Sequence, residues 1–148
     1  MIRGWFDPRA PQPLPRVTVG VWITGITFVW TPVEFMIDTG AGATLLHPRD
    51  SQYSVGISRS DLSDSRRWAG TVTYTGVGGD VTYFVTPVRY RFQHHDGRLQ
   101  HIDGTINVAP VRPDNRNVPS LLGWDVLSQF EVVMNWTTKT VELRDPTI

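Results

Sequence analysis

The feature that most constrains this fold is a series of short segments in which apolar and polar residues alternate one by one. One such run pairs Val17, Val19, Val21 and Ile23 with Thr18, Gly20, Trp22 and Thr24. This period of two is typical of a β-strand. Further strands are expected at residues 26–30, 33–37, 71–75, 81–85, 88–92, 131–136 and 140–144, with a turn at residues 31–32. Helical patterns are confined to residues 48–53 and 125–130, so the sequence predicts a mainly β fold with one or two short helices.

Three segments fall outside this pattern. Residues 1–15 carry prolines at positions 8, 11, 13 and 15, which hold a chain extended and remove backbone donors. We expect an exposed N-terminal arm there and a single folded domain over residues 16–148. Residues 54–67 are rich in Ser, Arg and Asp and predict a surface excursion. Residues 96–119 contain several Gly and Pro and predict broken strands with a loop at residues 113–117.

Composition excludes several classes of function. Fourteen basic residues balance fourteen acidic ones, which argues against nucleic acid as the main partner. The chain contains no cysteine, so disulfides, thiol catalysis and iron–sulfur clusters are excluded. No apolar stretch approaches the roughly 20 residues that span a bilayer, and no leader pattern opens the sequence. We therefore expect no membrane partner and a cytoplasmic location.

The sharpest candidate for chemistry is Asp38. It follows the apolar run Phe35-Met36-Ile37, and Gly40 lets the chain turn immediately after it. An acid at the end of a buried strand, held by a tight turn, is positioned rather than merely solvated. The plain alternative is an ordinary Asp-Thr-Gly turn, because such a tripeptide is common.

Two other segments favour the catalytic interpretation. Gly76-Val77-Gly78-Gly79 lies at the tip of a predicted hairpin, where glycines allow mobility and close approach of a backbone to a ligand. Ser120-Leu121-Leu122-Gly123 is an apolar strand that meets a glycine and then a short helix. Together with Asp38-Thr39-Gly40-Ala41 and Thr44, these segments resemble, in this order, the retropepsin family of aspartic proteases. The resemblance covers residues 17–144.

The resemblance implies a closed, β-rich acid-protease barrel that works as a homodimer. Asp38, Thr39 and Gly40 would form the catalytic turn, and Ala41 with the flap residues Gly76, Val77, Gly78 and Gly79 would bind a peptide or protein substrate. The sequence leads independently to a dimer. Acid proteolysis needs two carboxylates about one water apart, and no other Asp of the chain stands in this context. The second carboxylate must come from another copy across a two-fold axis.

Other patterns are assigned no function. His94, His95 and His101 are interpreted as surface residues, since adjacent residues on a strand point to opposite faces, and no metal or cofactor is expected. Trp124 follows Gly123 where many viral members have Arg; if the subunit-bridging contacts of that Arg are missing, another surface must hold the dimer. The main alternative function is a non-catalytic dimerisation or peptide-binding module of the same fold. A third possibility is a protease kept dormant by its own arm, residues 1–15.

Overall fold

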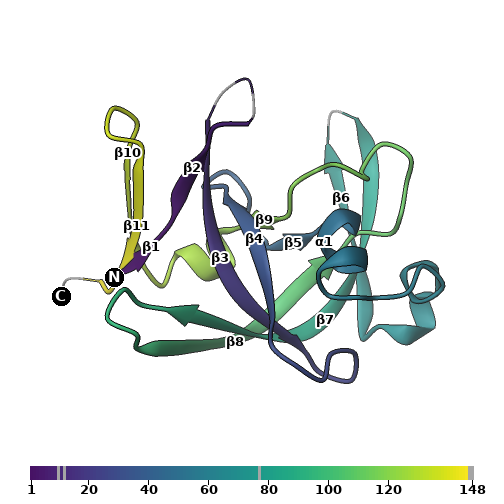
Figure 1. The fold of residues 1–148 in the computed structure, drawn as a ribbon. Coiled ribbons are helices and arrows are strands. Elements are labelled where there is room, and N and C mark those ends of the chain that lie inside the picture. Colours follow the sequence, from purple (N-terminus) through teal and green to yellow (C-terminus); the bar gives the residue numbers. More distant parts are fainter. Residues whose placement is uncertain (10, 12, 77, 147–148) are drawn as a thin grey trace.

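The computed structural model describes residues 1–146 apart from positions 10, 12 and 77, and folds them into two β-sheets with short helices (Figure 1). The strands are β1 (Ile2–Arg3), β2 (Trp5–Asp7), β3 (Leu14–Ile23), β4 (Thr31–Ile37), β5 (Leu45–Leu46), β6 (Gly70–Gly76), β7 (Gly79–Gln93), β8 (Leu99–Val108), β9 (Leu121–Leu122), β10 (Glu131–Asn135) and β11 (Thr140–Arg144). The helices are α1 (Pro48–Tyr53) and α2 (Trp124–Leu127), with two 3-10 turns, η1 (Asp61–Ser63) and η2 (Ser65–Arg67). The predicted mainly β class with short helices is confirmed.

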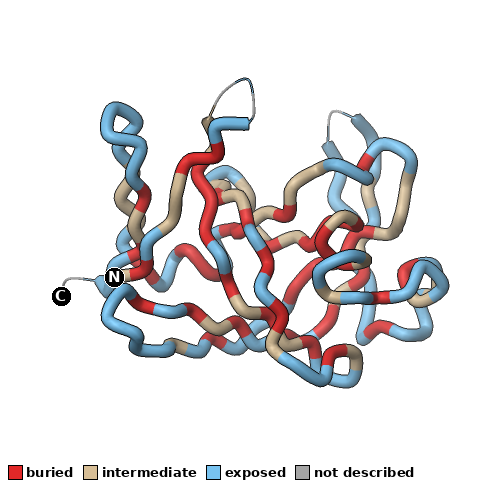
Figure 2. Tube along the Cα trace, in the orientation of Figure 1, coloured by how far each residue is buried: buried red, intermediate tan, exposed pale blue. Residues whose placement is uncertain are grey.

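The larger sheet has eight strands in the order β2-β3-β4-β9-β5-β8-β7-β6. The end of β3 also pairs with β7, in the register Ile23 with Val88, so the sheet folds back on itself. Its inner face carries the alternating apolar residues of β3 and β4, including Val19, Val21 and Phe35, all of which are fully buried. Figure 2 shows this buried surface running through the centre of the molecule while the hairpin tips are exposed. The period-two pattern therefore reports the core correctly.

One strand enters the sheet out of sequence order. β4 and β5 are consecutive in the chain, yet β9 lies between them, parallel to β4 and antiparallel to β5. Met36 aligns with Leu121 and Ile37 with Leu122. As a result, the segment 38–44 that links β4 to β5 lies directly beside the residues that follow β9.

Three predicted segments are wrong. Residues 26–30 are not a strand, because Gly25 has a φ of +80° and Thr27 closes a turn on Ile23 through its backbone N–H (2.9 Å) and its hydroxyl. The predicted turn at residues 31–32 is instead the start of β4. Within 96–119, residues 99–108 form one continuous strand, β8, rather than broken strands. Gly104 does not interrupt β8; it leaves room for the ring of Tyr90 on the neighbouring strand, 3.8 Å from where a Cβ would lie.

The prediction of an exposed N-terminal arm is also wrong for residues 2–7. Ile2 and Arg3 pair with β11, and residues 5–7 pair with β3. Ile2 and Phe6 are buried, and the carboxylate of Asp7 forms an ion pair with the buried guanidinium of Arg16 (3.0 Å). The prolines at positions 8 to 15 surround the connection between β2 and β3, so the start of the chain belongs to the folded body.

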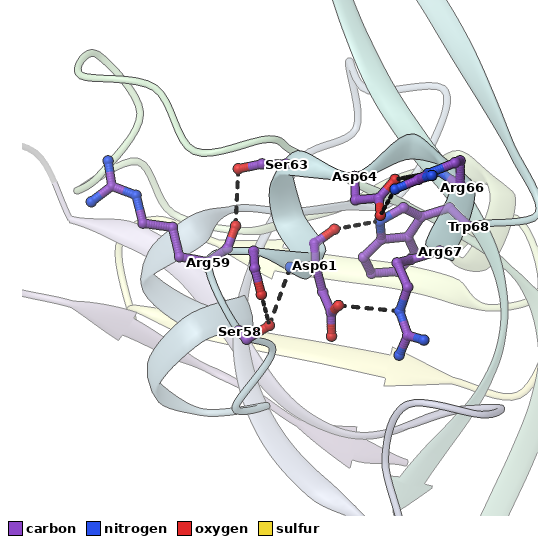
Figure 3. Close-up of polar contacts among 9 residues, drawn as sticks. Ser58, Arg59, Asp61, Ser63, Asp64, Arg66, Arg67 and Trp68 are labelled. Atoms are coloured by element: carbon purple, nitrogen blue, oxygen red, sulfur yellow. Dashed lines mark hydrogen bonds and ion pairs between the residues drawn. The ribbon is translucent and has the colours of Figure 1, made fainter.

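The surface excursion between α1 and β6 is held together by hydrogen bonds and ion pairs among its own residues (Figure 3). Asp64 forms a two-pronged ion pair with Arg66, Asp61 pairs with Arg67, and the Trp68 indole donates to the carbonyl of Asp61 (2.9 Å). Its surface position was predicted, but its apolar anchors were not. Leu62 is fully buried, and Trp68 stacks on Phe84 of β7 with centroids 5.4 Å apart.

The helix α1 spans the expected residues 48–53, whereas α2 begins one residue before the expected start and ends at Leu127, three residues short of the expected end. None of the helices in the described part of the chain is long and apolar enough to cross a membrane.

Candidate active site

Asp38 directly follows β4, whose inward side chains Val33, Phe35 and Ile37 are buried. The Asp38 N–H donates to the carbonyl of Leu122 (3.1 Å), which extends the β4–β9 pairing by one residue. The chain then turns, with the N–H of Ala41 donating to the carbonyl of Asp38 (3.2 Å). The N–H of Gly40 donates to Asp38 Oδ1 (2.9 Å). The carboxylate is therefore half-buried and oriented by its own turn, whereas Thr39 and Gly40 are exposed.

Gly123 packs against this turn from the β9 side. A Cβ at Gly123 would lie 2.5 Å from the carbonyl oxygen of Ala43 and 2.9 Å from that of Ala41. Because real Cβ atoms do not approach backbone so closely, only glycine fits here. The next residue, Trp124, donates its N–H to the carbonyl of Ala41 (2.8 Å). Two segments that are some 80 residues apart in the sequence are thus locked together around the candidate acid.

The lock is completed by Thr44 and Asp125. The fully buried Thr44 hydroxyl donates to Asp125 Oδ1 (2.7 Å) and accepts the N–H of Gly123 (3.1 Å). The second oxygen of Asp125 accepts the N–H of Thr44 (3.1 Å). Asp125 carries no sequence pattern that marks it, and sequence reasoning missed it. Its carboxylate holds the fold of the site rather than facing substrate.

The glycine-rich hairpin formed by β6 and β7 borders a cleft of about 600 Å³. Ala41, Gly42 and Ala43 line one side of it, and the flap residues Gly76, Gly78 and Gly79 line the other. The flap therefore lies opposite Ala41, the last residue of the predicted turn, whereas Asp38, Thr39 and Gly40 are not among the residues that line the cleft. Gly76 pairs with Gly79, which has a φ of +98° that favours glycine. Val77, the remaining predicted flap residue, lies outside the described residues.

Tyr74 joins the flap to the turn and was not predicted. Its ring lines the cleft, and its hydroxyl accepts a hydrogen bond from the side-chain amide of Asn107 (2.9 Å) in β8. The buried Asn107 in turn donates its backbone N–H to the carbonyl of Thr44 (3.0 Å). Tyr83, edge-on to Tyr74 at 5.8 Å, has its pKa raised by burial. These contacts give the cleft an aromatic wall.

The histidines do not form a metal centre, and no group of three or more His, Cys, Asp or Glu side chains in the described part of the chain could hold a metal ion. His94 and His95 follow the end of β7 at Gln93, so the expectation for adjacent residues on a strand does not apply to them. The expectation that all three lie at the surface is wrong for His94, which is buried and bonded through Nε2 to Gln100 (2.7 Å). The exposed His101 packs near Trp30.

No family model and no curated protein matches the sequence. A functional assignment therefore depends on the geometry of this site.

Proposed function

We propose that this protein is a retropepsin-like aspartic endopeptidase that acts as a homodimer with a closed acid-protease barrel in each subunit. One observation carries the proposal: the Asp38-Thr39-Gly40 turn ends a buried strand, is locked to Leu121–Gly123, and leads directly into Ala41, Gly42 and Ala43, which line a cleft opposite a glycine-rich flap. In the proposed enzyme this cleft would admit an extended peptide next to the turn that carries the carboxylate. It supports hydrolysis better than it supports any metal-dependent or nucleophilic side-chain chemistry.

The proposed reaction needs two carboxylates that share one proton, because two like charges so close cannot both ionise cheaply. Each subunit supplies one Asp38. The ionised Asp38 takes a proton from water, and the water oxygen bonds to the peptide carbonyl carbon while the protonated Asp38 donates to the carbonyl oxygen. Collapse of this intermediate breaks the C–N bond; the departing nitrogen takes the proton that the first Asp38 accepted from water, and a hydroxyl of the intermediate returns a proton to the second Asp38. Closure of the flap would exclude bulk water from these steps.

The resemblance supplies the remaining roles. Thr39, which is exposed at the turn, would brace the two turns across the dimer axis. Gly40 and Ala41 would present backbone groups to the substrate, and Gly76 to Gly79 would cover it. Asp125 and Thr44 would keep the turn in register with β9 without touching the substrate.

The test is an Asp38→Asn variant, assayed for cleavage of unfolded protein substrates from acidic to neutral pH. We expect cleavage to disappear while the fold and the dimer persist, because an amide can neither ionise nor share the proton. Asp103→Asn, which changes an exposed carboxylate on β8, is the matched control and should cleave normally. Cleavage by the Asp38→Asn variant at the wild-type rate would refute the proposal.

Subunit mixing tests the shared site. When excess Asp38→Asn chains are added to a fixed amount of wild type, mixed dimers form that contain a single acid, so activity should fall. Activity that stays constant while mixed dimers form would show that one Asp38 suffices. A wild-type protein that dimerises and binds peptides but never cleaves them would favour the non-catalytic binding module.

A further inference from the structure

A large apolar side chain lies exposed beside the candidate site. Trp124 opens α2 immediately after the buried Gly123, and 46% of its surface is accessible. The other exposed tryptophan, Trp136, is 54% accessible but packs edge-on against Phe6 at 4.9 Å. Trp124 has no aromatic partner of this kind among the described residues. Single exposed apolar side chains are common on protein surfaces, and Phe28 and Tyr53 are more exposed still, at 85% each; what distinguishes Trp124 is its place beside the candidate acid.

The position of Trp124 is fixed by the fold. Its N–H bonds to Ala41 (2.8 Å), and Ala41 bonds to the carbonyl of Asp38 (3.2 Å), so two hydrogen bonds separate the Trp124 backbone from that of the acid. On the other side, α2 buries Val126 and Leu127 in the core. The helix therefore cannot rotate to hide the indole without unpacking these two residues.

A second copy of this chain is the occupant that the site requires. The chain supplies one acid of the Asp-Thr-Gly type, and the proposed reaction brings two of them within about 3 Å of each other across a two-fold axis. A standard interface buries about 800 Å² per partner, equivalent to a disc about 16 Å in radius. A residue only two hydrogen bonds away from Asp38 falls inside such a disc.

We propose that Trp124 is an apolar anchor of the homodimer and is buried against the partner copy when the two Asp38 residues meet. This inference rests on the proposed function. Because a two-fold interface uses the same patch twice, each dimer would bury two such indoles, and tryptophan is among the residues that contribute most to binding when buried in an interface. The anchor would supply the subunit contact at the position where Trp124 follows Gly123.

A direct role in substrate binding would predict a different result. Trp124, like Asp38, is not among the residues that line the cleft between residues 41–43 and the flap. A substrate-binding indole would raise KM when it is removed, whereas a dimer anchor would not. Loss of the indole should weaken the association of subunits and leave the KM of the assembled dimer unchanged.

The experiment compares Trp124→Ala with Trp136→Ala, which removes an indole of similar exposure away from the turn. Sedimentation over a wide concentration range measures the dimer dissociation constant of each. We expect Trp124→Ala to raise it at least 30-fold, about the effect of a single binding hot spot, and Trp136→Ala to change it less than about threefold, the scatter of such determinations. Trp124→Phe, which keeps an aromatic side chain, should recover part of the affinity. Circular dichroism checks that α2 still folds.

Activity separates this inference from the proposed function. If both hold, the specific activity of Trp124→Ala rises with protein concentration along a curve shifted in parallel with its dissociation constant. Wild-type dimer strength in folded Trp124→Ala would overturn the anchor and leave the protease standing. Dimers that depend on Trp124 but do not cleave would overturn the protease and leave the anchor. A wild type that is monomeric at every concentration would overturn both.

Discussion

Thr44 links more parts of the candidate site than any other single side chain described above. Its hydroxyl joins Asp125 to the N–H of Gly123, and its carbonyl accepts the N–H of Asn107, the residue that also holds Tyr74. The acid turn, the strand beside it and the flap are therefore connected through one buried residue. Asp38 itself makes fewer contacts, which leaves its carboxylate available for chemistry.

Replacing this hydroxyl tests the connection. Thr44→Val keeps the shape of the side chain but leaves the buried Gly123 N–H without its acceptor and removes one of the donors to the Asp125 carboxylate. We expect the free energy of unfolding to fall by about 1–3 kcal/mol, measured by urea denaturation, with a larger proportional loss of cleavage. Thr44→Ser, which retains the hydroxyl, should lie near wild type. Equal stability of the Val and Ser variants would contradict the role of the hydrogen bonds.

At the residue scale, contacts between neighbours in the sequence could be predicted, whereas contacts between residues distant in the sequence could not. Asp38-Thr39-Gly40 is recognisable because the turn is made by adjacent residues, one of which is a glycine that follows the acid. Asp125 and Asn107 act on partners 81 and 33 positions away. Nothing in their immediate sequence marks these contacts, since only the folded sheet brings the partners together.

At the scale of elements, the fit between β9 and the acid turn depends on Gly123. Gly123→Ala would drive a methyl group into the carbonyls of Ala43 and Ala41. Overpacking of this kind typically costs about 1–3 kcal/mol, and the backbone that must move is the turn carrying Asp38. We expect both a lower melting temperature and a large loss of cleavage.

Gly42→Ala is the matched control for that variant, because no atom lies within 4 Å of the position of its Cβ. Its melting temperature should remain close to wild type; the comparison is made on stability, because Gly42 lines the cleft. If both alanine variants behave alike, the close contact between Gly123 and the turn does not determine the geometry of the site.

The predicted elements were correct where the alternation of residues reflected one buried face, as in β3 and α1. The predictions were wrong where a backbone turn or a strand pairing gave a segment a structure that its composition did not indicate. Residues 26–30 are apolar enough for a strand, but Gly25 and Thr27 close a turn first. Residues 2–7 precede a proline-rich stretch, yet pairing with β11 and β3 draws them into the sheets. Such pairings join residues that are distant in the sequence, so they could not be predicted locally.

At the scale of the whole molecule, acid affects stability through His47. Its Nδ1–H donates to the carbonyl of Pro119 (2.8 Å), and its backbone N–H donates to the buried Ser120, which bonds Asp50 (2.5 Å). Burial lowers the pKa of His47 below its usual 6.5, against the opposing effect of Asp50 and with a smaller contribution from Arg112. The folded protein therefore holds this histidine neutral where the unfolded chain protonates it.

It follows that the unfolded state binds more protons below pH 6.5, and folding stability should fall as the pH drops through that value toward the lower folded pKa. The slope from this one group is at most about 1.4 kcal/mol per pH unit. His47→Asn keeps a donor toward Pro119 but does not titrate. Urea midpoints measured from neutral to acidic pH should decline more steeply for wild type than for this variant; parallel curves would exclude His47 as the cause.

The insertion of β9 between β4 and β5 has a consequence for synthesis on the ribosome. When residues 38–44 leave the exit tunnel, the strand that orients them has not been translated, and it follows only about eighty residues later. A nascent chain therefore contains the residues Asp38-Thr39-Gly40 long before these residues can adopt the ordered turn. Pairing between strands so far apart in the sequence is slow to form. The order of translation itself delays the appearance of an organised acid until nearly the whole chain has emerged.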